Sequence, residues 1–285
     1  MCYATVNGAR LYYEVHGPTE RHPHDAPTLV FISGLGGHIA EVPHLVDAYR
    51  RPFRFLGFDG RGCGRSEATD GEYTIAGYAD DAAALFDALG IGAAFVYGSS
   101  MGGMVAQELA IRHPHRVAGL ILGCTTAGAV RGQPPSPETV QALIRNQMLS
   151  GDEALEAGWA LGYSRAYIEA NREAMYARAR AAARYATPRE SYMKQVLAAA
   201  RHDTYDRLAK IACPTLVLHG SDDVMMPLRN GELLARGIPG AELRVLHGMG
   251  HGYNLEAQEE ADAAVIEFVL RHHAATQVTG ARAVR

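Results

Sequence analysis

Two adjacent serines, Ser99 and Ser100, lie in a glycine-rich turn between an apolar run and a helix-like segment. Counted around Ser100, residues 98–102 match the pattern G-x-S-x-G, which lifts a serine hydroxyl above the end of a strand on a sharp strand-to-helix turn. In such a turn the backbones pass so close that the positions two before and two after the serine must be almost without side chains. Around Ser100 both are glycine, whereas around Ser99 they are tyrosine and methionine. Ser100 is therefore the candidate nucleophile, with a turn that does no chemistry as the alternative.

A serine hydroxyl needs a base to become a good nucleophile, and the base needs an acid that orients it. On this kind of turn the three residues follow one another as serine, acid and histidine. His251 lies in a glycine-rich segment directly after the last predicted strand, from which an imidazole can reach the serine. Asp222 and Asp223 both follow the preceding strand, and both are also typical helix caps. The residue pattern leaves the choice between these two acids open.

An acyl-transfer site also needs N–H groups for the negative charge that develops on the substrate oxygen. The amide of Met101 follows the candidate nucleophile at the start of a predicted helix, where the helix dipole adds to it. A second donor is expected from the glycine-rich segment 31–38, and the amide of Leu35 is the candidate. Gly34, in the same segment, is a candidate substrate contact. The alternative is that these glycines only form a strand-to-helix turn.

The elements that must position these residues alternate between short apolar runs and amphipathic segments. Strands are predicted at 28–33, 53–59, 93–98, 117–123, 214–220 and 241–248. Helices are predicted at 74–90, 101–113, 228–238 and 257–274. Such alternation is typical of a parallel sheet covered by helices on both faces. Asn7 and Gly8 form the strongest two-residue hairpin signal, which predicts two antiparallel strands near the N-terminus.

The alternation stops between residues 127 and 205, where the sequence is rich in alanine, arginine and glutamate and favours helices throughout. We interpret this segment as an all-helical insertion. Trp159, Tyr163 and Tyr167 are predicted to lie on one face of one of its helices. Trp159 and Met225 are candidate substrate contacts. The alternative is that the aromatic stripe only attaches the insertion to the rest of the protein.

The composition is that of an ordinary soluble globular protein. The chain has 285 residues, 48% of them hydrophobic, and a net charge of −4. No basic patch indicates nucleic acid, and no apolar run reaches the length of a membrane span. The four cysteines are scattered without metal-binding spacing, so we expect no metal or cofactor, and a reduced, cytoplasmic setting is favoured. We expect a small-molecule substrate as the partner, no membrane or nucleic-acid partner, an oligomeric state that stays open, and a flexible tail at 275–285.

Together these motifs resemble those of the α/β-hydrolase fold family over nearly the whole chain. Five segments carry the resemblance, in the family's order: 33–37 resembles its HG-x-G oxyanion loop, 59–66 its D-x-R-G-x-G-x-S turn, 98–103 its nucleophile elbow, 219–227 its HG-x-x-D-x-x-x-P acid loop and 250–256 its histidine loop. The family's acid loop puts the acid at Asp223. Ser33 is a departure, since many members have histidine there. Within the turn at 59–66 we expect Asp59 and Arg61 to pair.

The resemblance implies an α/β fold, with an eight-stranded, mostly parallel sheet, helices on both faces and an all-helical lid inserted after the sixth strand. It implies a core of residues 1–126 and 206–274 and a lid of residues 127–205. The chain is most similar to the esterase and lactonase branch, including 3-oxoadipate enol-lactonases and carbon–carbon bond hydrolases. This implies a cofactor-free serine hydrolase that cleaves a carboxylic ester or lactone of a small, mainly apolar molecule through an acyl-serine intermediate.

Three alternatives stay open at this point. The same residues serve a carbon–carbon bond or thioester hydrolase equally well. They also serve a lyase, cyclase or perhydrolase in which no ester is hydrolysed overall, or the fold forms a non-enzymatic small-molecule receptor. The serine nucleophile argues against haloalkane dehalogenases and epoxide hydrolases, because those enzymes need a carboxylate nucleophile.

Overall fold

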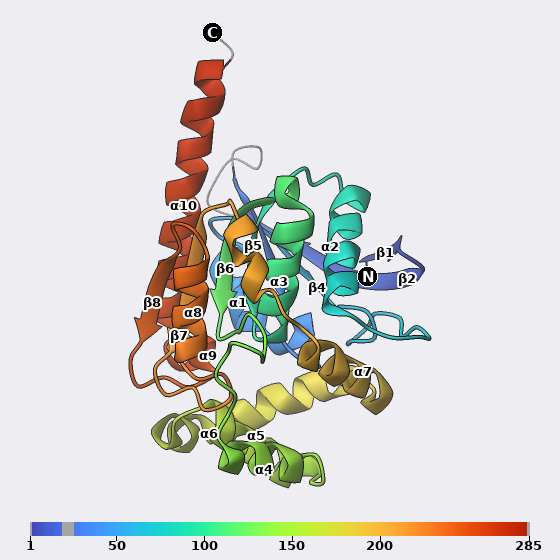
Figure 1. Cartoon of the computed structure of the whole chain (residues 1–285). Coiled ribbons are helices and arrows are strands. Elements are labelled where there is room, and N and C mark those ends of the chain that lie inside the picture. The colour runs from blue at the N-terminus through green and yellow to red at the C-terminus, as the bar shows by residue number, and fades with distance from the viewer. Residues whose placement is uncertain (1, 19–25, 284–285) are drawn as a thin grey trace.

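The computed structural model describes residues 2–18 and 26–283, with the side chains of 276–283 outside the description. Its centre is one eight-stranded sheet in the order β1-β2-β4-β3-β5-β6-β7-β8 (Figure 1). The strands are β1 (Cys2–Val6), β2 (Ala9–His16), β3 (Thr28–Ile32), β4 (Arg54–Phe58), β5 (Ala94–Ser99), β6 (Val117–Gly123), β7 (Thr215–Gly220) and β8 (Glu242–Leu246). β2 pairs antiparallel with β1 and β4, and all other neighbours are parallel. The predicted fold class is confirmed.

The hairpin between β1 and β2 forms where the sequence predicts it. Asn7 and Gly8 have φ angles of 45° and 76°, the left-handed values that a two-residue hairpin turn requires. The turn also contributes to packing, because the Asn7 amide donates to a carboxylate oxygen of Asp81 at 3.0 Å. The antiparallel edge of the sheet is therefore fixed by a local sequence signal.

Helices cover both faces of the sheet, and the central strands β3 to β7 are buried on both sides. Along β5, Val96 belongs to one buried cluster and Tyr97 to the other, because successive side chains of a strand point to opposite faces. The helices that pack on the Val96 face are α2 (Ile75–Ala88), α3 (Met101–Arg112) and α8 (Arg229–Gly237). Those that pack on the Tyr97 face are α1 (Pro43–Tyr49) and α10 (Gln258–Ala283). The core therefore consists of two apolar layers separated by the sheet.

An all-helical segment lies between β6 and β7, as predicted. It contains α4 (Pro137–Asn146), α5 (Gly151–Gly162), α6 (Arg165–Ala182) and α7 (Arg189–Ala200), which we call the helical insertion. Local capping sets two of its helix starts, since the hydroxyls of Ser136 and Ser164 accept from backbone amides three residues ahead. Figure 1 shows the helical insertion gathered at one end of the sheet.

The predicted aromatic stripe on one helix is wrong. α5 ends at Gly162, so Tyr163 caps that helix and Tyr167 belongs to α6. The two tyrosine rings nevertheless stack with centroids 5.4 Å apart, because the chain turns sharply between the two helices. Trp159 packs instead against Tyr176 of α6, with ring centroids 4.8 Å apart.

The predicted pair of Asp59 and Arg61 is also wrong. The carboxylate of Asp59 is fully buried and accepts from the amide of Ile39 at 2.8 Å and from the guanidinium of Arg65 at 3.2 Å. Arg61 turns the other way and binds Asp81 at 2.8 Å. The carboxylate of Asp59 thus holds the loop after β3 against the loop after β4. The sequence around Asp59 does not reveal this contact, because Ile39 belongs to a different loop.

The C-terminal helix is longer than predicted. The backbone of α10 is helical to Ala283, past the helix end predicted at residue 274 and into the segment 275–285, while residues 284–285 lie outside the described ones. The flexibility of that segment stays a prediction.

The four cysteines are free thiols. Among the described residues, no helix combines the length and apolar character needed to cross a bilayer.

Candidate active site

The candidate residues gather at one edge of the sheet because they follow five strands of its six-stranded parallel part. β3, β5, β6, β7 and β8 run in the same direction, so their carboxyl ends meet at the same edge. This edge is the usual ligand-binding side of an open α/β sheet. Segments that are far apart in the sequence are thereby brought together in the loops that follow these strands.

Ser100 stands at the end of β5 in a strained conformation. Its φ of 55° and ψ of −121° lie in a region that residues with a side chain rarely adopt. A Cβ added to Gly98 would collide with the carbonyl oxygen of Gly102, and one added to Gly102 would collide with that of Ile32. The two glycines thus allow the close approach of strand and helix that the sequence pattern predicts.

Neighbouring residues hold this turn in place. The backbone amide of Ser100 donates to the carbonyl of Gly123 at 2.8 Å, and the hydroxyl of Thr125 donates to the carbonyl of Ser100 at 2.7 Å. Met101 is the first residue of α3, so its amide has no partner within the helix and lies at the positive end of the helix dipole. Thr125 was not among the predicted site residues, and no local motif marks it.

His251 and Asp223 form a direct pair. The Nδ1 atom of His251 lies 2.7 Å from Oδ2 of Asp223. The Asp223 carboxylate is fully buried, and its other oxygen accepts from the amides of Met225 and Met226 at 2.9 and 2.8 Å. Asp222 is exposed, and its carboxylate accepts from the neighbouring Ser221 hydroxyl at 2.7 Å instead. Of the two candidate acids, Asp223 is therefore the one beside the imidazole.

The charges around His251 favour its protonated form. Burial lowers the pKa of His251, but the nearby Cys124 and Asp223 raise it by more, so that the pKa lies well above its ordinary value. His219 is buried next to the same carboxylate, with Nε2 3.8 Å from Asp223, and burial lowers the pKa of His219. Asp223 thus lies between His251, whose protonated form it stabilises, and His219, which stays neutral.

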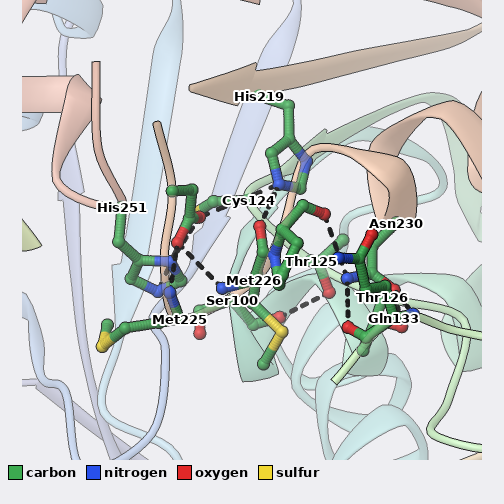
Figure 2. Close-up of polar contacts among 12 residues, drawn as sticks. Ser100, Cys124, Thr125, Thr126, Gln133, His219, Met225, Met226, Asn230 and His251 are labelled. Atoms are coloured by element: carbon green, nitrogen blue, oxygen red, sulfur yellow. Dashed lines mark hydrogen bonds and ion pairs between the residues drawn. The ribbon is translucent and has the colours of Figure 1, made fainter. Parts of the chain in front are cut away.

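Cys124 is the unexpected neighbour of the imidazole. Its Sγ atom lies 3.9 Å from Nε2 of His251 and 3.5 Å from the hydroxyl of Ser99. It directly follows β6 and has a φ of 39°. Figure 2 shows Cys124, His251 and Ser100 within one group of side chains. The only sequence signal for this contact is the position of Cys124 at the carboxyl end of a strand.

The glycine-rich loop after β3 lies over Ser100. A Cβ added to Gly34 would lie 3.2 Å from Cβ and 3.7 Å from Oγ of Ser100, so a larger side chain at this position would press on the serine. The amides of Gly36 and Gly37 are already used, since they donate to the side chain of Gln195 at 2.8 Å and to the carbonyl of Gly34 at 3.0 Å. Within the described part of the chain, nothing accepts from the amide of Leu35, which leaves that donor available.

A cavity of about 410 Å³ lies between the helical insertion and the rest of the protein. Trp159 lines it, whereas Met225 is not among the lining residues. The cavity wall contacts the histidine loop at the end of α5, where the amide of Gly252 donates to the carbonyl of Gly162 at 2.8 Å. Tyr163 also lines the cavity. Its ring packs so closely on Gly252 that a Cβ added to Gly252 would collide with the ring.

Comparisons with known proteins add an independent observation. The family model of the alpha/beta hydrolase fold matches residues 27–258. A putative carbamate hydrolase RutD from Caulobacter sp. (strain K31) is 30% identical over 280 residues, with 93% of this chain and 97% of that protein covered.

Solved structures agree with this match. The enol-lactonase from Burkholderia xenovorans LB400 has a TM-score of 0.81 and 29% identity over 94% of this chain and 100% of its own. Est816, described as an N-acyl homoserine lactone degrading enzyme, has a TM-score of 0.75 and 27% identity, with 94% of this chain and 100% of its own covered.

Proposed function

Because the chain belongs to the alpha/beta hydrolase fold family and its relatives are hydrolases, we propose that it is a serine hydrolase acting on a carboxylic ester or lactone of a small molecule. The observation that carries this proposal is the combination of a strained Ser100 and a hydrogen-bonded pair of Asp223 and His251 at the same edge of the sheet. A conformation that costs on the order of 1–3 kcal/mol persists where function requires it.

Each residue has a defined role in the proposed reaction. His251 takes the proton of the Ser100 hydroxyl as its oxygen attacks the substrate carbonyl, and Asp223 holds the imidazole in the correct orientation. The amides of Leu35 and Met101 stabilise the negative oxygen that develops. His251 then gives the proton to the leaving alcohol, and an acyl group stays on Ser100. Water, activated by the same imidazole, releases the acid, and no step uses a metal or cofactor.

The relatives support an acyl carbonyl as the reacting group. The enol-lactonase and Est816 resemblances, at 29% and 27% identity, favour an ester or lactone bond. The helical insertion would act as a lid over that substrate, with Gly34 next to the nucleophile and Trp159 in the cavity wall. A second candidate substrate is a carbamate, favoured by the 30% identity to a putative carbamate hydrolase. A carbamate offers the same carbonyl to Ser100, with nitrogen attached to it.

Labelling with a fluorophosphonate tests this proposal directly. Mass spectrometry should locate one adduct, on Ser100, and the Ser100→Ala protein should take none. Turnover of a p-nitrophenyl ester and of the matching p-nitrophenyl carbamate then separates the two substrates. An adduct on another residue, or an adduct without turnover of any ester, lactone or carbamate, would overturn the proposal.

A further inference from the structure

The cavity between the helical insertion and the core is mainly apolar but contains one cation. It is lined by residues of α5 and α6 and by the segment that follows the glycine-rich loop, among them His38, Glu41, Trp159, Tyr163, Met175 and Arg178. Its volume of about 410 Å³ is within the range of small-molecule sites. Aromatic and aliphatic walls with a small number of polar or charged groups are typical of a site for an amphipathic small molecule.

Arg178 differs from the other arginines of α6. Arg165, Arg172 and Arg180 each form an ion pair with a carboxylate of the helical insertion. In the described part of the chain no carboxylate forms an ion pair with Arg178, and its Nη1 atom is buried without a hydrogen-bond partner. A buried guanidinium nitrogen without a partner costs free energy, and a ligand that supplied an acceptor would remove this cost.

The other ionisable groups near Arg178 do not pair with it. Burial lowers the pKa of His38, and burial together with the charge of Arg178 lowers the pKa of His44 to about 4, so both imidazoles are neutral. Glu41 also lines the cavity, but its side chain is 47% exposed and its carboxylate lies 3.4 Å from Nε2 of His38. In the described part of the chain no ion pair joins Glu41 to Arg178, so the guanidinium is a positive charge on the cavity wall without a counter-ion.

We propose that the cavity binds a carboxylate group of the substrate, with Arg178 as its counter-ion. A carboxylate matches the planar fork of a guanidinium through two parallel hydrogen bonds. This inference rests on the proposed function, because it specifies the substrate as an acyl compound with a second, anionic end. Tyr163 lies between the cavity and the histidine loop, so the carboxylate is held away from the reacting carbonyl. Trp159 and Tyr163 would contact the carbon chain that joins the two ends.

Paired substrates test the proposal. The probes are p-nitrophenyl monoesters of linear dicarboxylic acids of rising chain length, each compared with its methyl-capped neutral counterpart. At the best chain length we expect kcat/KM to favour the anionic ester by about tenfold or more. Arg178→Gln should remove this preference by lowering kcat/KM for the anionic ester. Arg178→Lys should keep part of the preference, because it keeps the charge.

Arg180→Gln is the matched control. Arg180 lies two positions further along α6 and faces outward to Asp152 at 3.4 Å. This variant should keep the full preference for the anionic ester. Equal turnover of the anionic and neutral esters by the wild-type protein, or an unchanged preference in Arg178→Gln, would overturn the carboxylate proposal. Neutral-ester turnover reports on the proposed function separately, so the two failures are distinguishable.

A binding measurement gives a readout that does not depend on turnover. Trp159 is the single tryptophan of the chain and lines the same cavity, so its fluorescence reports on occupancy. Titration with hexanoate should give a saturable change in the wild-type protein, and hexanamide should give a much smaller one. Arg178→Gln should weaken hexanoate binding about tenfold or more. Equal responses to hexanoate in the two proteins would contradict the assignment.

Discussion

The Nδ1–H group of His251 donates a 2.7 Å hydrogen bond to a carboxylate oxygen of Asp223, a residue 28 positions earlier in the chain. The two residues belong to loops that follow adjacent parallel strands, β7 and β8, and meet because those strands end at the same edge. The remaining oxygen of Asp223 is occupied by two backbone amides, which fix the carboxylate before any substrate is present. The pair is therefore preorganised, and its neighbours provide the most direct tests of the proposed mechanism.

Ser100→Ala should lower kcat for ester hydrolysis by roughly 10⁴-fold or more, because the nucleophile is lost while the rest of the site is kept. The thermal midpoint should change little, since alanine keeps the backbone geometry. Ser99→Ala is the control, and it should retain most of the activity although its hydroxyl contacts Cys124. Steady-state kinetics of both variants, measured at equal folded concentration, check this expectation. Loss of activity in Ser99→Ala but not in Ser100→Ala would show that Ser99, and not Ser100, is the nucleophile.

Asp223→Asn should lower kcat by roughly 10³- to 10⁴-fold, because the amide no longer selects the productive imidazole tautomer. The pH profile supplies a second readout. His251 must be neutral to act as a base, and Asp223 is one of the groups that raise the pKa of His251. Without that carboxylate the pKa falls, so the rise of kcat/KM with pH should move to lower pH. Asp222→Asn should change neither quantity, and a profile that moves to higher pH in Asp223→Asn would contradict this account.

Gln195→Met should lower kcat by about tenfold and change KM much less. The buried side chain of Gln195 accepts from the amide of Gly36 at 2.8 Å and donates to the thiol of Cys63 at 2.8 Å. It is thus a positioning residue, which holds the loop of the proposed oxyanion donor Leu35 from α7. Leu197→Gln, at an exposed position of the same helix, should leave both constants unchanged. A fall in thermal midpoint without a fall in kcat would show that Gln195 is only structural.

Gly102→Ala should destabilise the fold by about 2 kcal/mol or more, because the new Cβ would collide with the backbone carbonyl of Ile32, which cannot move without shifting β3. Gly92→Ala is the matched control. A Cβ at Gly92 meets no atom within 4 Å, so this substitution should be neutral or slightly stabilising. Urea unfolding curves of the two variants give the comparison. Equal midpoints would mean that the close approach at Gly102 is not needed for folding.

His202 should make the free energy of unfolding depend on pH in the mildly acidic range. Burial lowers the pKa of His202 to about 4, while in the unfolded chain it returns to its ordinary value of about 6.5. Between these two values the unfolded chain binds more protons, so stability falls as the pH falls through this window. The contribution is on the order of 3 kcal/mol. His202→Gln should flatten the slope of stability against pH between about 6.5 and 4, and an unchanged slope would assign the acid sensitivity elsewhere.

The sequence determined the features that depend on near neighbours along the chain. Strand and helix alternation predicted the parallel sheet, and the glycines around Ser100 predicted a sharp turn, because the close approach of Gly98 to Gly102 occurs within five residues. The hairpin at Asn7 followed in the same way from local backbone preferences. α1 was not predicted, since it has only seven residues and lacks a side-chain cap, although proline at its first position is typical of a helix start.

Only the tertiary structure decided the contacts between loops that are distant in sequence. The partner of Asp59 is Arg65 instead of Arg61, Cys124 lies next to His251, and no carboxylate among the described residues pairs with Arg178. Each outcome depends on which side chains meet when five strand ends and four insertion helices pack together. A sequence pattern records the spacing of residues along the chain, whereas these pairings depend on the direction and distance of loops that only the packed sheet fixes.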